Sequence, residues 1–293
     1  MKPNVWQAMK PAELSLGDFL RKTSPEITQL VELPQQTLLV LLSHVLEQPQ
    51  TWILAHSEAE LSATQQAKIT ALIARLKQGE PLPYLTGRQE FFGLSFEVSP
   101  AVLIPRPETE LMVETALRWL RLHPAANSAV DVGTGSGCIA VSLAVNAPTL
   151  HIVATDISAE ALAIAQRNAQ FHHVEDRITF QEADLISAEL GRFDLVCANL
   201  PYVPTSRLAK VNSLPYEPAL ALNGGPDGLA LIKRCLAYAP AHIRAPGMLL
   251  FEIEASTGNA AIALAREAFP QAKVTLIPDL AGRDRLMSIE CEP

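Results

Sequence analysis

The stretch Asp131-Val132-Gly133-Thr134-Gly135-Ser136-Gly137 decides the fold of this chain. It continues the apolar segment 129–132, which reads as a buried strand, and leads into a helical pattern at 137–145. A glycine-rich turn from a strand into a helix is where a doubly wound sheet binds a nucleotide-like ligand, at the carboxyl ends of its strands. The stretch therefore predicts a ligand site in an α/β domain.

The same alternation of strands and helices extends from residue 108 to the end of the chain. Helices are expected at 108–122, 137–145, 159–170, 227–238 and 257–268, and strands at 129–132, 151–155, 178–181, 193–198, 248–252 and 273–277. Strands that alternate with helices form a parallel sheet covered on both faces. We expect an α/β fold with a doubly wound, mostly parallel sheet.

The chain before this pattern has a different character. Residues 1–80 read as short helices and predict a small helical bundle. Pro81-Leu82-Pro83 is expected to break the helix that precedes it, and 87–98 reads as a β-hairpin with Gly93 at its turn. The expected parts are an N-terminal bundle over 1–80, a linker with a hairpin over 81–107 and the sheet domain over 108–293.

Composition excludes several classes of protein. The 293 residues carry a net charge of −8 with a pI near 5.4, which disfavours direct binding of nucleic acid through its phosphates. The cysteines are far apart without a Cys-x-x-Cys pair, so neither a metal site nor a disulfide framework is expected. The chain shows neither a signal peptide nor an apolar run of membrane-spanning length. We expect a cytoplasmic monomer without membrane contact.

The tetrapeptide Asn199-Leu200-Pro201-Tyr202 follows the apolar strand 193–198 and suggests methyl transfer to a planar nitrogen. Such a nitrogen, in an amide or an adenine amine, has its lone pair delocalised into the neighbouring π system. The Asn199 side-chain oxygen and the Leu200 carbonyl can accept its two hydrogens, and both bonds strengthen as positive charge moves onto the nitrogen. Pro201 keeps Leu200 extended, and Tyr202 can pack on the planar acceptor. These four residues are the predicted catalytic and substrate-binding residues.

Acidic residues distinguish the expected cofactor. Asp156 ends the second strand, where it can accept hydrogen bonds from ribose hydroxyls. Asp131 would be repelled by a pyrophosphate but attracted by the ammonium of a methionine moiety, which favours S-adenosyl-L-methionine over NAD. Asp184 is placed to bind the adenine amino group, with Leu185 against the ring. The predicted cofactor residues are Asp131, Gly133, Thr134, Gly135, Ser136, Gly137, Asp156, Asp184, Leu185 and Asn199.

Over nearly its whole length the chain resembles the protein-(glutamine-N5) methyltransferases of the PrmC/HemK family. Besides the glycine-rich stretch and the tetrapeptide, the matching segments are 83–88, 91–94, 103–110, 217–220, 224–229 and 279–285. Ile104-Pro105-Arg106-Pro107-Glu108-Thr109-Glu110 is the most specific, because adenine methyltransferases that share Asn-x-Pro-Tyr lack it. The resemblance implies a class I S-adenosylmethionine-dependent methyltransferase fold. It also implies methylation of the glutamine in the Gly-Gly-Gln motif of class 1 peptide chain release factors, which the N-terminal bundle helps to bind.

One position departs from the family pattern. The family usually has Asn-Pro-Pro-Tyr, and Leu200 replaces the first proline here, which keeps the carbonyl but loses the fixed φ. Because Asn-Leu-Pro-Tyr also resembles rRNA adenine dimethyltransferases, the alternative is an adenine-N6 methyltransferase acting on rRNA or DNA. The negative charge, the helical N-terminal region and residues 105–110 oppose it. A cofactor-binding protein without catalysis is disfavoured because Asn199 and Tyr202 are both present.

Overall fold

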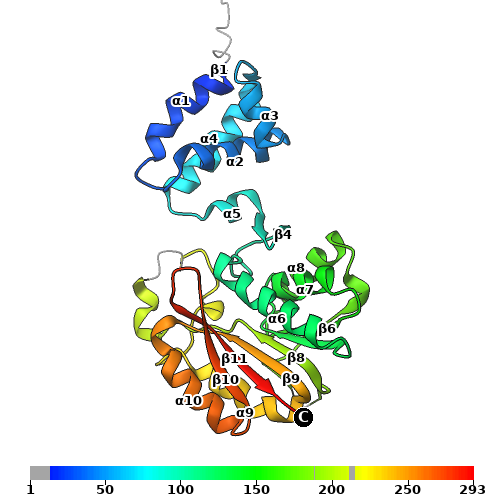
Figure 1. Cartoon of the computed structure of the whole chain (residues 1–293). Helices are drawn as coiled ribbons and strands as arrows, with labels where there is room; N and C mark the ends of the chain where they lie inside the picture. Colours follow the sequence, from blue (N-terminus) through cyan, green and yellow to red (C-terminus); the bar gives the residue numbers. More distant parts are fainter. Residues whose placement is uncertain (1–13, 188, 211–214) are drawn as a thin grey trace, which may run out of the picture. The chain divides into compact units, whose positions relative to one another are not determined.

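The computed structural model describes residues 14–187, 189–210 and 215–293, so the first 13 residues of the predicted bundle lie outside the described residues. The chain divides into two compact units, one ending at Thr86 and one beginning at Gly87 (Figure 1). This division groups residues 81–86 of the predicted linker with the first unit and the rest of the linker with the second.

The first unit is helical. Its elements are β1 (Leu14–Ser15), α1 (Leu16–Ile27), α2 (Pro34–Leu46), α3 (Gln50–Ala55), β2 (Glu60–Leu61), α4 (Ala63–Lys77) and α5 (Leu82–Thr86). Fully buried side chains such as Ile27, Leu38 and Ile69 form its apolar core. The helix before Pro81-Leu82-Pro83 ends as expected, because α4 ends at Lys77 and a separate short helix, α5, begins at Leu82. Pro83 lies in the first turn of α5, where a missing N–H leaves no bond unmade.

The second unit begins with the predicted hairpin. Strands β3 (Arg88–Phe91) and β4 (Leu94–Glu97) pair in antiparallel register. Phe92 and Gly93 between them have φ values of 51° and 72°. Positive φ at both central residues is the geometry that tight hairpins favour, because its twist matches that of the strands. The hairpin prediction, with Gly93 in the turn, is confirmed.

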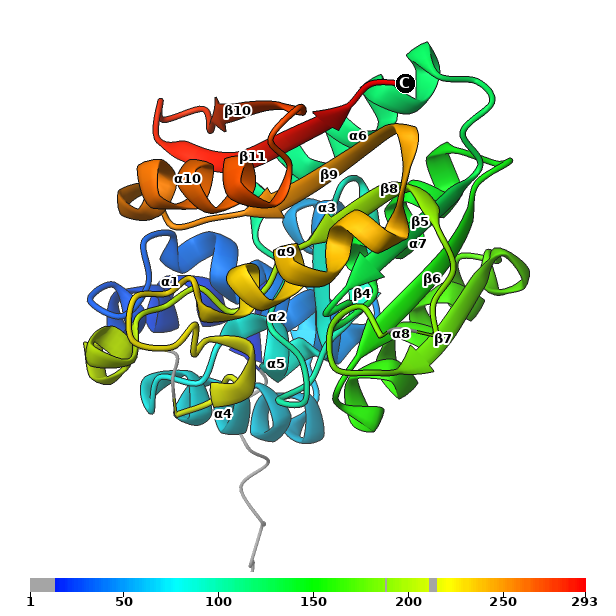
Figure 2. The same cartoon turned by 90° about the horizontal axis from the view of Figure 1, so that it is seen from below.

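A mostly parallel sheet forms the centre of the second unit (Figure 2). Its strands are β5 (Ser128–Val132), β6 (His151–Asp156), β7 (Ile178–Glu182), β8 (Phe193–Ala198), β9 (Ile243–Glu252), β10 (Lys273–Pro278) and β11 (Asp284–Cys291). Their order is β10-β11-β9-β8-β5-β6-β7, with β5 to β9 parallel and β11 antiparallel to both neighbours. The predicted doubly wound sheet is confirmed, whereas β11 was not predicted.

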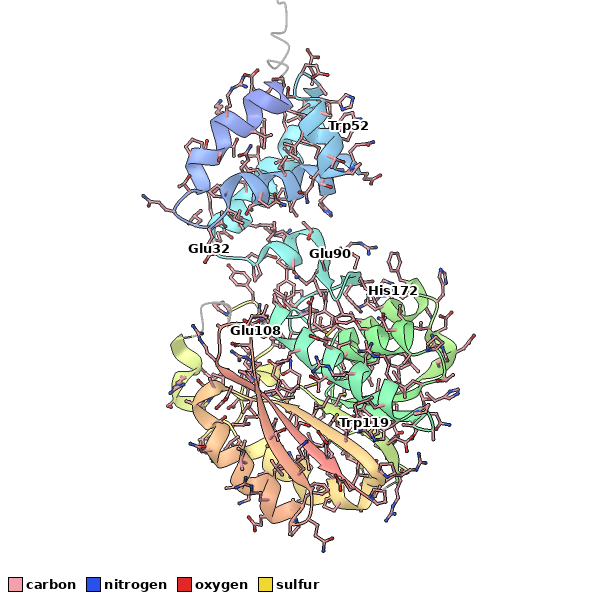
Figure 3. The ribbon with its side chains drawn as sticks, in the orientation of Figure 1. Glu32, Trp52, Glu90, Glu108, Trp119 and His172 are labelled. Carbon is pink, nitrogen blue, oxygen red and sulfur yellow. The ribbon has the colours of Figure 1, made fainter. Side chains whose placement is uncertain are left out.

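Helices cover both faces of the sheet. They are α6 (Glu110–Leu122), α7 (Cys138–Asn146), α8 (Ala159–Phe171), α9 (Ala230–His242) and α10 (Gly258–Ala268), with short 3-10 turns at Pro107–Thr109, Glu175–Arg177, Thr205–Lys210, Ala219–Ala221 and Ala255–Thr257. One apolar cluster joins the sheet to α6, α7 and α8 and contains Trp119, labelled in Figure 3. A second cluster joins the opposite face to α9 and α10. β8 shows the two faces directly, since Leu195 belongs to the first cluster and Val196 to the second.

The connectivity places a site between β5 and β8. From β5 the chain proceeds through β6 and β7 toward one edge, and from β8 it proceeds through β9 toward the other. β5 and β8 are therefore neighbours from which the chain winds in opposite directions, which is the switch point where ligands bind in open α/β sheets. The glycine-rich stretch follows β5 and the tetrapeptide follows β8.

Candidate active site

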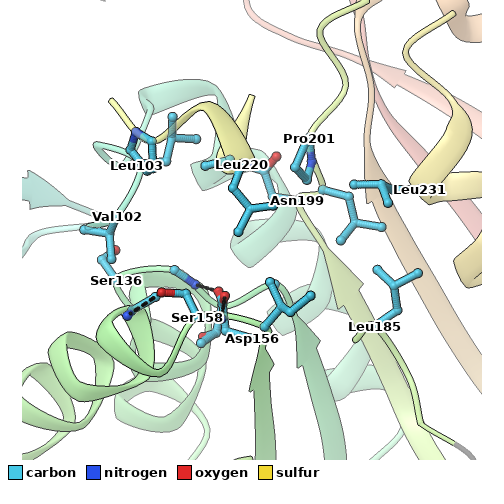
Figure 4. Close-up of a pocket in the computed structure, with 18 of the residues that line it drawn as sticks. Val102, Leu103, Ser136, Asp156, Ser158, Leu185, Asn199, Pro201, Leu220 and Leu231 are labelled. Atoms are coloured by element: carbon cyan, nitrogen blue, oxygen red, sulfur yellow. Dashed lines mark hydrogen bonds between the residues drawn. The ribbon is translucent and has the colours of Figure 1, made fainter. Parts of the chain in front are cut away.

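A pocket lies at this switch point (Figure 4). We call residues 133–137 the glycine loop and residues 199–202 the acceptor tetrapeptide, and both contribute to the pocket wall. The predicted residues that line the pocket are Gly133, Thr134, Gly135, Ser136, Asp156, Asp184, Leu185, Asn199, Leu200 and Pro201. Asp131, Gly137 and Tyr202 are not among the lining residues. The structure thus brings the two predicted halves together in one cavity.

The glycine loop has a backbone that other residues adopt at a cost. Gly133, Gly135 and Gly137 have φ values of 71°, 56° and 79°, in the left-handed region that glycine enters freely. A Cβ at Gly137 would lie 3.0 Å from the Ala165 Cβ of α8, whereas a Cβ at Gly135 would meet no atom within 4 Å. The loop is therefore tightly packed where it meets α8 and open to a ligand at Gly135.

Asp156 connects the end of β6 to the glycine loop. Its Oδ2 accepts a hydrogen bond of 2.9 Å from the Gly135 amide, and its Oδ1 accepts one of 2.9 Å from the Ser158 amide. Each carboxylate oxygen can accept a further bond, and Asp156 and Ser158 both line the pocket in Figure 4. The side chain can thus hold the loop and bind ligand hydroxyls together.

Asp131 lies buried beneath the glycine loop. Its Oδ2 accepts hydrogen bonds from the Thr134 hydroxyl at 2.6 Å and the Ala140 amide at 3.2 Å. Its Oδ1 has no hydrogen-bond partner among the described residues. Burial raises the pKa of Asp131 to about 7, although both hydrogen bonds lower it. A buried oxygen without a partner fits a ligand that brings a cationic donor, as the ammonium of S-adenosylmethionine does.

Asp184 and Leu185 form the side of the pocket after β7. The Asp184 carboxylate pairs with Arg234 of α9 at 2.7 Å, a partner that sequence reasoning missed. Leu185 has a φ of 64° and a buried side chain. Leucine rarely adopts a left-handed backbone, and such strain is concentrated at binding and catalytic sites. Both residues line the pocket, and their contact with adenine stays a prediction.

The acceptor tetrapeptide is held from two other segments of the chain. The Asn199 Nδ2 donates to the Thr109 Oγ1 at 3.0 Å, and the Tyr202 hydroxyl donates to the Glu252 Oε1 at 2.9 Å. Thr109 in turn donates to the Glu252 Oε2 at 2.6 Å. Burial and the Glu252 carboxylate raise the pKa of Tyr202, which keeps its hydroxyl protonated as a donor. Tyr202 is thus anchored to the end of β9.

Sequence reasoning missed Thr109 and Glu252 as parts of the site. Glu252 has 1% of its surface exposed and ends the otherwise apolar run Met248 to Phe251. A charged residue at the end of a buried strand was the available signal, because a buried carboxylate needs hydrogen-bond donors. Thr109 lies within the family-specific segment but carries no mark of its role in the sequence.

An ion pair between Arg106 and Glu217 joins two segments of the chain that line the pocket. Arg106 donates to both carboxylate oxygens of Glu217, at 2.8 and 2.6 Å, and the Ile104 amide adds a bond of 3.2 Å. The Glu217 side chain is fully buried. This pair joins residues 103–106 to residues 217–221, and both segments supply apolar lining residues.

The described residues were also compared with the requirements of a metal site and of a membrane-spanning helix. Across 14–187, 189–210 and 215–293, no three His, Cys, Asp or Glu side chains are grouped so that they could hold a metal ion. In the same ranges no helix combines the length and the apolar composition needed to cross a membrane.

Comparison with known proteins identifies the family. Residues 18–87 match the family model of the PrmC N-terminal domain, and residues 109–212 match that of the methyltransferase small domain. The release factor glutamine methyltransferase of Moorella thermoacetica is 42% identical over 274 residues, which cover 92% of this chain and 95% of that protein. The protein of the same name from Bordetella pertussis is 40% identical over 258 residues, covering 87% and 94%. The chain belongs to the release factor glutamine methyltransferase family.

A solved structure supports the fold independently. The crystal structure of the hMettl16 catalytic domain in complex with MAT2A 3′UTR hairpin 6 is similar with a TM-score of 0.54 at 17% identity, over 68% of this chain and 76% of that one. At this identity the likeness concerns the fold alone. With the family established, the predicted class I methyltransferase fold is confirmed. The chain is a methyltransferase whose methyl donor is S-adenosyl-L-methionine.

Proposed function

We propose that this chain transfers a methyl group from S-adenosyl-L-methionine to the side-chain amide nitrogen of the glutamine in the Gly-Gly-Gln motif of class 1 peptide chain release factors. The observation that carries the proposal is the hydrogen bond from the Asn199 Nδ2 to Thr109, which leaves the Asn199 Oδ1 free to accept an amide hydrogen. Asn199 lies in the same pocket as the glycine loop. Family membership supports glutamine as the acceptor.

The acceptor tetrapeptide would activate the amide without a general base. The Asn199 Oδ1 accepts one hydrogen of the glutamine NH₂ group and the Leu200 carbonyl accepts the other. S-adenosylmethionine supplies a methyl group on a positively charged sulfur. As the bond from the methyl group to sulfur breaks and the bond to nitrogen forms, positive charge moves onto the amide nitrogen and both hydrogen bonds strengthen, so they would stabilise the transition state more than the bound substrate. The methylated nitrogen would then lose one hydrogen as a proton to solvent, which leaves the neutral N-methyl amide. The glutamine plane is held by the same two bonds.

The residues around the glycine loop would bind and orient the cofactor. Asp156 accepts hydrogen bonds from the ribose hydroxyls, and the ionised form of Asp131 attracts the methionine ammonium. Asp184 and Leu185 contact the adenine ring. The Arg106–Glu217 ion pair keeps the apolar lining segments 103–106 and 217–221 in place, which limits access of water to the reacting groups.

We further propose that the helical first unit helps to bind the release factor and that the protein acts as a cytoplasmic monomer without direct nucleic-acid contact. The match of residues 18–87 to a family-specific domain supports the first point. The net charge of −8 supports the last, because nucleic acid would be repelled.

The decisive experiment offers the protein two classes of acceptor. Isotope-labelled S-adenosylmethionine is incubated with the protein and either a class 1 release factor or ribosomal RNA, and mass spectrometry locates the label. We expect label on the Gly-Gly-Gln glutamine and its loss when that glutamine is replaced by alanine. Label on adenine, with the release factor unmodified, would establish the alternative function instead.

A further inference from the structure

The acceptor tetrapeptide is attached at both ends to one buried carboxylate. Glu252 receives the Tyr202 hydroxyl at 2.9 Å on one oxygen and the Thr109 hydroxyl at 2.6 Å on the other. Thr109 then receives the Asn199 Nδ2 at 3.0 Å. Thr109 is itself 2% exposed, so this chain of bonds is shielded from water. Asn199 and Tyr202 are therefore positioned through the same side chain.

The chain of bonds has a fixed direction. The Thr109 and Tyr202 hydroxyls both donate to the Glu252 carboxyl group, so the single hydroxyl hydrogen of Thr109 is committed to Glu252. The Thr109 oxygen can then only accept, and its partner on Asn199 must be the donating Nδ2. The Asn199 Oδ1 is consequently the atom left for the substrate. With the amide turned over, the Asn199 NH₂ group would face the NH₂ group of the glutamine, donor against donor.

We propose that Thr109 and Glu252 are positioning residues that fix the Asn199 amide in the orientation needed for methyl transfer. The inference rests on the proposed function, since it concerns how that site accepts a glutamine amide. Neither residue touches the reacting atoms, and the effect passes through Asn199. A hydroxyl at position 109 is required, whereas the remainder of the threonine side chain is not.

Thr109→Val tests this requirement, because valine has nearly the same shape but can neither donate nor accept. We expect kcat for release factor methylation to fall about tenfold or more, since the part-buried Asn199 amide loses the partner that orients it. The affinity for S-adenosylmethionine should stay within about twofold of the wild type. Thr109→Ser should recover most of the lost rate. Thr115→Val, at a second buried threonine on α6, is the matched control for stability and rate.

A second readout separates orientation from general damage. A release factor with Gly-Gly-Glu in place of Gly-Gly-Gln presents a carboxylate, which the correctly oriented Asn199 Oδ1 repels. In Thr109→Val the amide can turn over and donate to that carboxylate. The altered release factor should therefore inhibit Thr109→Val several-fold better than it inhibits the wild type, an increase that a merely loosened site does not produce.

The outcomes are distinguishable. If the wild type binds S-adenosylmethionine but does not methylate the release factor, the proposed function fails. If the wild type is active and Thr109→Val matches Thr115→Val in kcat and in inhibition by the altered release factor, the positioning role fails. Should Thr109→Val fold poorly because Glu252 loses a donor, the double variant Thr109→Val/Glu252→Gln removes the buried charge. It should fold and still show the loss of kcat.

Discussion

The glycine loop and the acceptor tetrapeptide follow adjacent parallel strands, yet they are held in different ways. The loop is fixed by positive φ values and by backbone amides, as in the Gly135 bond to Asp156, 21 residues away. The side chains of Asn199 and Tyr202 instead bond to Thr109 and Glu252, 90 and 50 residues away. The glycine loop thus depends mainly on its own backbone conformation, whereas the acceptor tetrapeptide depends on side-chain contacts with distant segments of the chain.

This difference predicts which kinetic quantity each half controls. Changes near the glycine loop should act on the affinity for S-adenosylmethionine, because that half contains the groups that bind the cofactor. Changes in the acceptor tetrapeptide should act on kcat, because its hydrogen bonds strengthen only as the methyl group transfers. Variants that move both quantities together would show that the two halves are not separable.

Asn199→Ala should have the largest effect. It removes an acceptor for the glutamine NH₂ group, and losing such a group typically lowers kcat by about a hundredfold or more. The affinity for S-adenosylmethionine should change much less. Steady-state kinetics on a release factor and calorimetry with the cofactor measure the two quantities. Asn146→Ala, where the amide bonds only within α7, is the control. Turnover near that of the wild type would contradict the role of Asn199.

Asp156→Ala tests the cofactor half. The variant removes an acceptor for the ribose hydroxyls and the bond to the Gly135 amide. Hydrogen bonds to a charged group contribute about 1.5–3 kcal/mol, so the affinity for S-adenosylmethionine should fall roughly tenfold to a hundredfold. At saturating cofactor, kcat should recover toward the wild-type value. Asp176→Ala, at an exposed acid that does not line the pocket, is the control. Unchanged affinity would remove Asp156 from the ribose site.

The cofactor half of the pocket could be predicted from the sequence because it depends on local features. The glycine spacing and the acids at 131 and 156 are local features, and the strand and helix around them follow from hydrophobic periodicity. The predicted order of elements from β5 to β10 is accordingly confirmed. β11 escaped prediction, and its pairing between β9 and β10 depends on residues far away in the sequence.

The supports of the acceptor half could not be predicted in the same way. Thr109, Glu252 and the Arg106–Glu217 pair act through contacts over long sequence separations, and a single sequence contains no measure of which segments meet. Only the resemblance marked residues 104–110 as special, without saying which atoms matter. Tyr202 illustrates this limit of prediction. The sequence predicts the tetrapeptide itself, but not the hydrogen bond of the Tyr202 hydroxyl to Glu252.

A smaller effect concerns Asp131 and pH. Burial raises the pKa of Asp131 to about 7, so the carboxyl is increasingly protonated below that pH. A cationic ligand favours the ionised form, which means that binding releases a proton and that affinity falls as the pH falls. Relative to Asp131→Asn, the affinity of the wild type for S-adenosylmethionine should decrease about tenfold from pH 8 to pH 6.

Asp131→Asn is a matched variant because the Asp131 Oδ2 alone accepts both hydrogen bonds, and the asparagine oxygen can replace it. The ratio of the two affinities also cancels titration of the cofactor itself. Calorimetric titrations across this pH range give the ratio directly. A ratio that does not vary with pH would place the methionine ammonium away from Asp131.

Leu200→Pro should have the smallest effect on kcat, and it tests whether the two halves of the pocket act separately. Leu200 stands where the family usually has proline, and both residues present the carbonyl that the mechanism requires. Its side chain also joins the two halves, since its Cδ2 would lie 3.2 Å from a Cβ at Gly133. Proline has a smaller side chain than leucine, so less of it can pack beside Gly133. The substitution also fixes the φ angle of residue 200.

If the position acts through its carbonyl alone, Leu200→Pro keeps glutamine methylation within a few-fold of the wild-type kcat. The loss of the Leu200 side chain from the pocket wall beside Gly133 should then decrease the affinity for S-adenosylmethionine modestly, so that a change in the acceptor half affects the cofactor half. Assays on a release factor and on ribosomal RNA, with the product located by mass spectrometry, examine both proteins. A proline variant that gains release factor methylation absent from the natural chain would show that Leu200 instead reshapes the acceptor slot.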